Sequence, residues 1–179
     1  MVTADEQRDT RYRLAAAEFG GALVRLARAY EPDVDRRRDL LQDIHLELWR
    51  SFAAYEEQCS LRTWVYRVAH NVGISRRIRK RKLRLVSLDA ADGIHTGDNT
   101  AEQADAAHDV ARLYVLIRQL ESPDDQVMLL YLEDMDAAAI GEVTGLSPNA
   151  VAMRIHRVKA ILTERFRLRS ECRPGVRHE

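Results

Sequence analysis

The chain has 179 residues, of which 46% are hydrophobic, and its 28 Lys and Arg residues balance 28 Asp and Glu residues. This composition supports one domain or two small ones with buried cores, and it excludes a disordered chain. No run approaches the roughly 18 apolar residues of a membrane span. The N-terminus carries acids where a signal peptide would be basic and then apolar. We therefore expect a cytoplasmic protein that does not contact a membrane.

Charge is strongly segregated along the chain. Residues 61–86 contain nine basic residues and no acid, whereas residues 87–111 contain six acids and no Lys or Arg. Residues 154–173 are again basic, with seven Lys and Arg residues against two acids. Such blocks indicate two polyanion-binding surfaces on either side of a solvated acidic segment. A charged helix face in water is the plainer alternative.

Helical periodicity runs through nearly the whole sequence, and no segment of five or more residues alternates like a strand. The apolar face of a first helix is expected to begin with Leu14, Ala17 or Glu18, Gly21 and Val24. A second helix is predicted over residues 35–54, with apolar residues at helical spacing on one face. Another face of that helix carries an acidic stripe at successive i+4 steps, formed by Asp39, Asp43 and Glu47.

A third helix follows a polar loop. Ser60 is its expected N-cap, and its end is expected within the basic residues 76–82. Trp64 lies on the apolar face with Val68, so we expect Trp64 in the core. Residues 87–109 are poor in large apolar residues, which predicts a flexible linker before helical patterning resumes.

Residues 136–157 have the punctuation of a helix-turn-helix. Asp136 can cap a first short helix, and Gly145 supplies a positive φ after it. Ser147 can cap a second helix, with Pro148 in its first turn. The core-facing residues of the second helix are expected to be Val151, Ile155, Val158 and Leu162. A plain αα-hairpin is the alternative, but the neighbouring Arg and Lys residues favour a helix that enters a DNA groove.

With these segments identified, the chain resembles the bacterial extracytoplasmic-function (ECF, group IV) sigma factors of the RNA polymerase sigma family. Residues 39–50 resemble the region 2 helix that binds core polymerase, and residues 60–71 resemble the segment that begins −10 recognition. Residues 120–162 resemble region 4, which reads the −35 element. The resemblance extends over about residues 17–168. It implies a sigma factor that binds core RNA polymerase and directs promoter-specific initiation.

We therefore expect an all-α protein with two small helical domains joined by an acidic flexible linker. The expected parts are an N-terminal tail (1–14), a region 2 helical bundle (15–86), the linker (87–109), a region 4 helix-turn-helix domain (110–169) and a C-terminal tail (170–179). The partners that the resemblance implies are promoter DNA, the largest-subunit coiled coil of the polymerase and the flap of its second-largest subunit. An anti-sigma factor is a further candidate partner.

The resemblance also implies site residues. Contacts with core polymerase are expected at Leu40, Gln42, Asp43, Leu46, Glu47 and Trp49, with Leu48 in the same run. Contacts with −10 DNA are expected at Tyr55, Arg62, Asn71, Arg76, Arg77, Arg79, Lys80, Arg81 and Lys82. Contacts with −35 DNA are expected at Ser147, Asn149, Ala152, Met153, Arg154, His156, Arg157 and Lys159.

The resemblance assigns two of these residues a chemical role. A −10 base would be flipped from its stack into a pocket under residues 55–62, where Tyr55 could stack on it and Asn71 could read an edge. Ala152 stands where relatives often carry a basic residue, so the −35 preference does not carry over from them.

No catalytic motif, metal-ligand cluster or cofactor site stands out in the sequence, so we expect no enzyme, no metal and no cofactor. Cys59 and Cys172 are expected to be plain cysteines. Two alternatives stay open. One is a stand-alone helix-turn-helix regulator that binds DNA as a dimer without polymerase. The other is an adaptor that binds a protein through its acidic helix and binds nucleic acid non-specifically.

Overall fold

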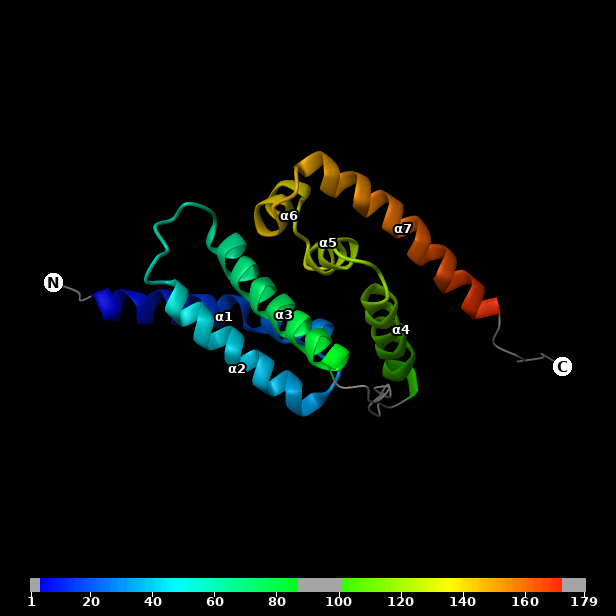
Figure 1. Ribbon diagram of the computed structural model, residues 1–179, viewed down its shortest axis with the longest axis horizontal. Coiled ribbons are helices and arrows are strands. Elements are labelled where there is room, and N and C mark those ends of the chain that lie inside the picture. The colour runs from blue at the N-terminus through cyan, green and yellow to red at the C-terminus, as the bar shows by residue number, and fades with distance from the viewer. Residues whose placement is uncertain (1–3, 87–100, 172–179) are drawn as a thin grey trace. The chain divides into compact units, whose positions relative to one another are not determined.

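The computed structural model describes residues 4–86 and 101–171, and within these ranges the backbone forms seven α-helices and no strand (Figure 1). The helices group into two compact units. The first contains α1, α2 and α3, and the second contains α4, α5, α7 and the first half of α6. The all-α, two-domain prediction is confirmed. No helix in the described ranges has both the length and the apolar character needed to cross a membrane.

The first unit is a bundle of α1 (Ala4–Tyr30), α2 (Val34–Ser51) and α3 (Leu61–Val86). Each of these helices packs against the other two. Side chains at most 1% exposed come from all three helices: Leu23, Leu26, Leu40, Ile44, Leu48 and Val65. Full burial of one such side chain is worth about 1.5–3 kcal/mol, so this core holds the three helices together.

The face of α1 that enters the core differs from the predicted one. Leu14 and Val24 are 61% and 49% exposed, whereas Leu23 and Leu26 are each 1% exposed. Alanine and glycine occupy much of the circumference of α1, so apolar periodicity did not single out one face. Packing against α2 and α3 selects the face instead. The predicted N-terminal tail is also wrong, because α1 begins at Ala4.

Side-chain caps define where α2 and α3 begin. Asp33 Oδ1 accepts the backbone N–H of Arg36 at 2.9 Å, and this hydrogen bond lowers the pKa of Asp33. The predicted cap of α3 is confirmed, since Ser60 Oγ accepts the N–H of Thr63 at 3.0 Å. The helix then continues through residues 76–82, where its end was expected, because Arg and Lys are good helix formers.

The second unit contains α4 (Ala101–Arg118), α5 (Asp124–Tyr131), α7 (Pro148–Glu171) and the first half of α6 (Ala137–Thr144). Its helix α5 packs against both α4 and α7. The fully buried hydrophobic side chains include Ile117, Val127, Leu130, Ile140, Val151 and Val158. The linker was expected over residues 87–109, but α4 already begins at Ala101. The preceding residues 87–100 lie outside the described ones.

The helix-turn-helix punctuation is confirmed. Asp136 Oδ1 accepts the N–H of Ala139 at 2.8 Å, and Ser147 Oγ accepts the N–H of Ala150 at 3.3 Å. Gly145 has a φ of +77° between the two helices. These three local signals set the start of α6, the end of α6 and the start of α7.

A second glycine in this motif has a tertiary role that the sequence analysis missed. A Cβ built on Gly141 would lie 2.6 Å from the carbonyl oxygen of Leu146. The turn backbone therefore passes directly against α6, and only glycine permits that approach. Gly141 lies inside a helix, where no turn signal marks its need for a missing side chain.

Candidate polymerase and DNA interfaces

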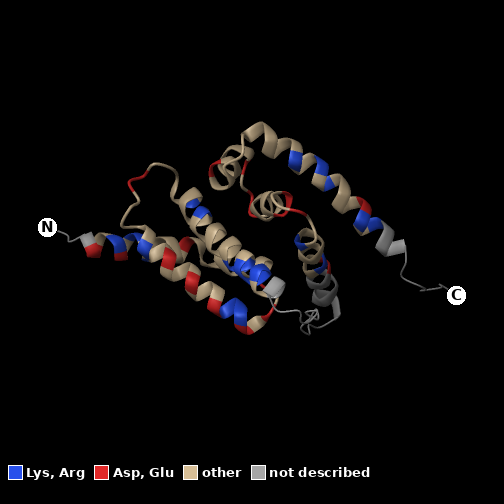
Figure 2. Cartoon of the chain, in the orientation of Figure 1, with Lys and Arg blue, Asp and Glu red and all other residues tan. Residues whose placement is uncertain are grey.

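Exposed residues of α2 form an acidic surface, and the acidic residues of the helix are the red bands along α2 in Figure 2. This acidic surface consists of the exposed residues Asp39, Gln42, Asp43, Leu46 and Glu47. Leu40 and Leu48, which were predicted to contact a partner, do not belong to it. Leu40 is 1% exposed and Leu48 is 0% exposed, because both sit on the stripe of α2 that packs against α1 and α3.

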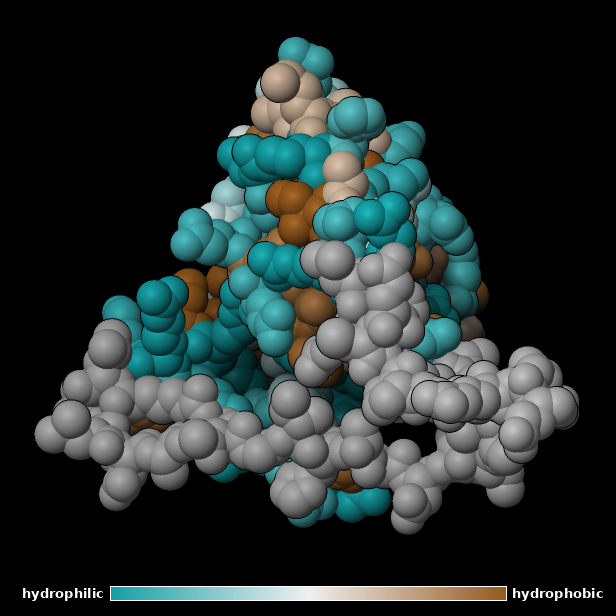
Figure 3. All heavy atoms as spheres, turned by 90° about the vertical axis from the view of Figure 1, so that its right-hand side faces the viewer, coloured by the Kyte–Doolittle hydropathy of each residue, from teal (hydrophilic) through white to brown (hydrophobic). Residues whose placement is uncertain are grey.

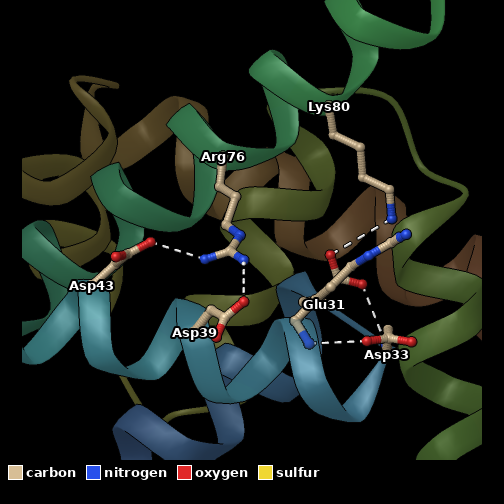
Figure 4. Close-up of polar contacts among 7 residues, drawn as sticks. Glu31, Asp33, Asp39, Asp43, Arg76 and Lys80 are labelled. Carbon is tan, nitrogen blue, oxygen red and sulfur yellow. Dashed lines mark hydrogen bonds and ion pairs between the residues drawn. The ribbon is translucent and has the colours of Figure 1, made fainter.

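Arg76 links the acidic surface to the basic end of α3. Its guanidinium lies 2.8 Å from Asp43 Oδ2 and 3.5 Å from Asp39 Oδ2 (Figure 4). The Arg76 side chain is 28% exposed. Arg76 was expected to hold DNA phosphates, but in this structure its charge is directed at two carboxylates of α2. A residue predicted for the −10 interface is thus paired with carboxylates of the acidic surface of α2.

Lys80 is likewise tied to a carboxylate. Its Nζ lies 3.6 Å from Glu31 Oε2, and Glu31 is only 5% exposed (Figure 4). The other oxygen of Glu31 accepts the backbone N–H of Asp33 at 3.2 Å. The basic residues of this stretch that are clearly exposed are Arg79, Arg81 and Lys82, whereas Arg77 is half-buried.

The first turns of α1 cover part of α2. Trp49 was expected to contact polymerase, but its Nε1 donates to Asp9 Oδ1 at 2.8 Å, and the Arg8 guanidinium lies 3.7 Å from the ring centroid. The neighbouring His45 is half-buried, and its Nδ1 lies 3.1 Å from the hydroxyl of Tyr12. Burial lowers the pKa of His45, which favours the neutral imidazole.

Tyr55 is packed inside the loop that was expected to receive a flipped base. The residue is 8% exposed, and its hydroxyl donates to the carbonyl oxygen of Cys59 at 2.9 Å. Its ring centroid lies 5.8 Å from that of Phe52 and 5.2 Å from that of Trp64. Burial raises the pKa of the Tyr55 hydroxyl. The ring is therefore engaged in an aromatic cluster and offers no free face for stacking in this conformation.

The other predicted −10 residues of α3 differ in exposure. Asn71 and Arg62 are exposed, and the Arg62 guanidinium lies 5.7 Å from the ring centroid of Tyr66. Trp64 is half-buried, and its Nε1 donates to Ser51 Oγ at 2.9 Å. This contact between α3 and the end of α2 agrees with a packing role for Trp64.

The predicted DNA-binding residues at the start of α7 and along it differ in how exposed they are. Those fully on the exposed side are Ser147, Asn149, Ala152, Met153, His156, Arg157 and Lys159, with Met153 68% exposed. Arg154 is half-buried. Lys159 Nζ lies 3.3 Å from the hydroxyl of Tyr131, at the end of α5.

Asp124, the first residue of α5, was not predicted as a site residue. Its Oδ1 accepts from Arg154 Nη1 at 2.6 Å, and its Oδ2 accepts from Arg157 Nη2 at 2.5 Å. In the sequence Asp124 looks like an ordinary acid at a helix N-terminus, where it complements the helix dipole. Its partners lie about thirty residues later, so no local pattern identifies them.

The surfaces of α2, α3 and α7 carry charged residues together with single exposed apolar residues such as Leu46, Ile78 and Met153. On the face seen in Figure 3, hydrophilic residues predominate and hydrophobic ones form small, separate patches. Cys59 is a half-buried free cysteine, and Cys172 lies outside the described residues. The two helical units, the charged helices and the helix-turn-helix together define a helix-turn-helix DNA-binding protein.

Comparison with known proteins narrows this class to one family. Residues 16–84 match the model of Sigma-70 region 2, and residues 111–162 match that of Sigma-70 region 4. The chain is 25% identical over 154 residues to the ECF RNA polymerase sigma factor SigW of Bacillus subtilis, covering 75% of this chain and 78% of SigW. The solved structure of CnrH in complex with the cytosolic domain of CnrY shares the fold, with a TM-score of 0.67 and 20% sequence identity. The match covers 92% of this chain and 93% of the CnrH chain.

The chain belongs to the sigma-70 family of RNA polymerase sigma factors, and within it to the ECF type. It binds core RNA polymerase and directs promoter-specific transcription initiation through recognition of −10 and −35 elements. A stand-alone regulator is not favoured, because a helix-turn-helix alone would leave the region 2 match over residues 16–84 unexplained.

Proposed function

We propose that α2 binds core RNA polymerase through its acidic surface. The exposed carboxylates of Asp43 and Glu47 and the 46% exposed Leu46 support this assignment. An acidic helix face with an apolar residue suits a partner helix that carries basic residues. By family resemblance, that partner is the coiled coil of the largest subunit. Leu40 is left out because it is buried, and Trp49 because α1 covers it.

For the −10 element, the exposed end of the basic stretch is proposed to hold the DNA backbone. Arg79, Arg81 and Lys82 are exposed on a helix that contains no acid. Arg76 and Lys80 are proposed to position α3 against its neighbours, since both face carboxylates of this chain. Long-range attraction to phosphates needs charges that solvent can reach.

Base reading is proposed to take place at Asn71 and under the loop that follows α2. Asn71 is exposed, and its amide can pair with a base edge. Tyr55 could stack on a flipped base only after the loop opens, because its hydroxyl and ring are both engaged.

For the −35 element, the exposed face of α7 around Asn149, Met153 and His156 is proposed to read sequence. By family resemblance, the second unit also binds the flap of the second-largest subunit.

Three further points follow from the family assignment. CnrH is in complex with the cytosolic domain of CnrY in the solved structure, and an anti-sigma factor is proposed as a partner of this chain as well. The chain is proposed to act in the cytoplasm, where RNA polymerase transcribes. As a regulator of transcription, it is proposed to carry no catalytic site of its own.

Removing exposed charges from the end of α3 is expected to weaken DNA binding and its salt dependence. For Arg79→Gln with Arg81→Gln, we expect the slope of log affinity against log salt to fall by about 1.4–1.8, since each phosphate contact contributes about 0.7–0.9. The matched control is Arg36→Gln with Arg38→Gln, which removes two exposed charges from α2. Titration of the holoenzyme with promoter DNA at several salt concentrations measures both slopes. Equal slopes for the two double variants would contradict the assignment.

The direct test of the proposed function is transcription by purified core polymerase on a library of genomic fragments, with and without the chain. We expect discrete new start sites that depend on the chain and share two sequence elements upstream. Binding of the chain alone, as a dimer on a palindrome and without any effect on polymerase, would instead establish the stand-alone regulator. Non-specific binding alone would favour the adaptor.

A further inference from the structure

We propose that Asp124 is a positioning residue that sets the specificity of −35 recognition by holding Arg154 and Arg157 beside the DNA-binding face of α7. The proposal rests on the proposed role of α7 in reading the −35 element. Asp124 itself lies in α5 and need not touch DNA. It acts through the two arginines, to which it presents one carboxylate oxygen each.

Asp124, Arg154 and Arg157 form a cluster, here called the clamp, in which each carboxylate oxygen of Asp124 binds one guanidinium. Asp124 Oδ1 lies 2.6 Å from Arg154 Nη1, and Asp124 Oδ2 lies 2.5 Å from Arg157 Nη2. The Asp124 side chain is only 17% exposed, so it has little access to water as an alternative partner. A guanidinium has five N–H donors, and each arginine uses one of them in its hydrogen bond to Asp124. The remaining donors stay available for phosphates.

The clamp is anchored in the rigid part of the second unit. Helix α5 packs against α7, and Val127 and Leu130 of α5 are fully buried. Arg154 and Arg157 are i,i+3 neighbours, so they share one flank of α7, between buried Val158 and exposed Met153. Because Asp124 is held in place by this packing, it gives two long, flexible side chains a defined direction.

The carboxylate also sets the local charge. Two arginines and one aspartate carry a net charge of +1, whereas the arginines alone would carry +2. Two unrestrained guanidiniums would reach phosphates of any sequence, which strengthens non-specific binding. With the arginines held, the exposed residues Asn149 and His156 contribute more to the choice of sequence. Asp124 therefore lowers the affinity of α7 for DNA of any sequence and increases its discrimination between −35 sequences.

The first arm of the test measures binding of the full-length chain to a short DNA duplex of random sequence over a range of salt concentrations. For Asp124→Asn we expect an affinity increase of about threefold to tenfold and a slope steeper by about 0.9, the contribution of one added phosphate contact. The matched control is Glu121→Gln, which removes an exposed carboxylate three residues earlier in the chain. We expect it to change affinity by less than about twofold.

The second arm measures discrimination by the holoenzyme, on a promoter selected from the genomic library and on the same promoter with a scrambled −35 element. Asp124→Asn is expected to lower the ratio of the affinity for the intact promoter to that for the scrambled promoter by about fivefold to tenfold. The double variant Asp124→Asn with Arg157→Gln returns the local charge to +1. It is expected to restore the wild-type slope on random DNA. Thermal unfolding of each variant reports whether it is folded.

The outcomes separate the proposal from the proposed function. A folded Asp124→Asn protein with weaker random binding, with an unchanged salt slope, or with the same behaviour as Glu121→Gln would overturn the clamp. A merely structural role would lower binding to both DNAs without steepening the slope. If the wild-type chain supports no transcription with core polymerase, the proposed function fails, whereas the random-duplex arm still decides whether Asp124 restrains the arginines.

Discussion

Asp43→Arg is expected to abolish promoter-specific transcription by the holoenzyme. Asp43 lies at the centre of the acidic surface of α2, with its side chain 57% exposed. Placing a positive charge there would repel a basic partner helix. Loss of a hydrogen-bonded charge pair at an interface costs about 2–5 kcal/mol of binding free energy, or roughly 30-fold to several thousandfold in affinity. Pull-down of core polymerase and run-off transcription measure the two consequences.

The same substitution disturbs Arg76 inside the chain, so a control must separate the two effects. The double variant Asp43→Arg with Arg76→Asp restores an ion pair of opposite polarity, but it still presents the wrong charge to polymerase. We expect it to remain inactive. Asp35→Arg changes an exposed acid in the first turn of α2, outside the acidic surface, and is expected to be active. Recovery of transcription by the double variant would mean that Asp43 acts only by holding Arg76.

Gly73→Ala is expected to destabilise the first unit although alanine is the better helix former. A Cβ on Gly73 would lie 2.5–2.9 Å from three ring carbons of Tyr30. The Tyr30 ring has little freedom to move, because its residue is 7% exposed and its hydroxyl lies 2.5 Å from Nδ1 of buried His70. Overpacking of this kind costs about 1–3 kcal/mol and outweighs the gain in helix propensity, about 1 kcal/mol.

Gly20→Ala is the matched control in α1. Nothing lies within 4 Å of the position of a Cβ on Gly20, so we expect a gain of about 0.5–1 kcal/mol from helix propensity alone. Both tryptophans of the chain, Trp49 and Trp64, lie in the first unit. Tryptophan fluorescence during urea unfolding therefore reports on this unit separately. If Gly73→Ala were as stable as Gly20→Ala, the close packing of Tyr30 on α3 would be refuted.

The start of α3 and the boundaries within the helix-turn-helix followed from signals that act within one turn. Ser60, Asp136 and Ser147 were predicted as caps, and each accepts the backbone N–H three residues later. Gly145 was predicted to have a positive φ and has one. A cap needs only the chain that follows it, so these predictions required no knowledge of the packing. The α1 face failed because several apolar stripes compete on an alanine-rich helix.

Within the candidate sites, the sequence located the segments but did not determine the state of each side chain. The acidic stripe of α2 and the exposed end of α3 were predicted from charge and spacing. Leu40 was assigned to a partner but is buried, and Tyr55 was assigned to base stacking but is packed against Phe52 and Trp64. Family resemblance carries a residue type to a position, but it does not say which way that position faces in this chain.

By itself, the sequence determined the helical fold, the two units, the helix-turn-helix and the family, because periodicity, caps and motif order are properties of neighbouring residues. Only the tertiary structure decided which polar side chains pair with one another. Arg76 pairs with Asp43 across 33 residues, Arg154 with Asp124 across 30, and Trp49 with Asp9 across 40. Such pairs depend on how each helix is rotated against its neighbours. That rotation is set by the packing of buried side chains, to which the exposed charges contribute little.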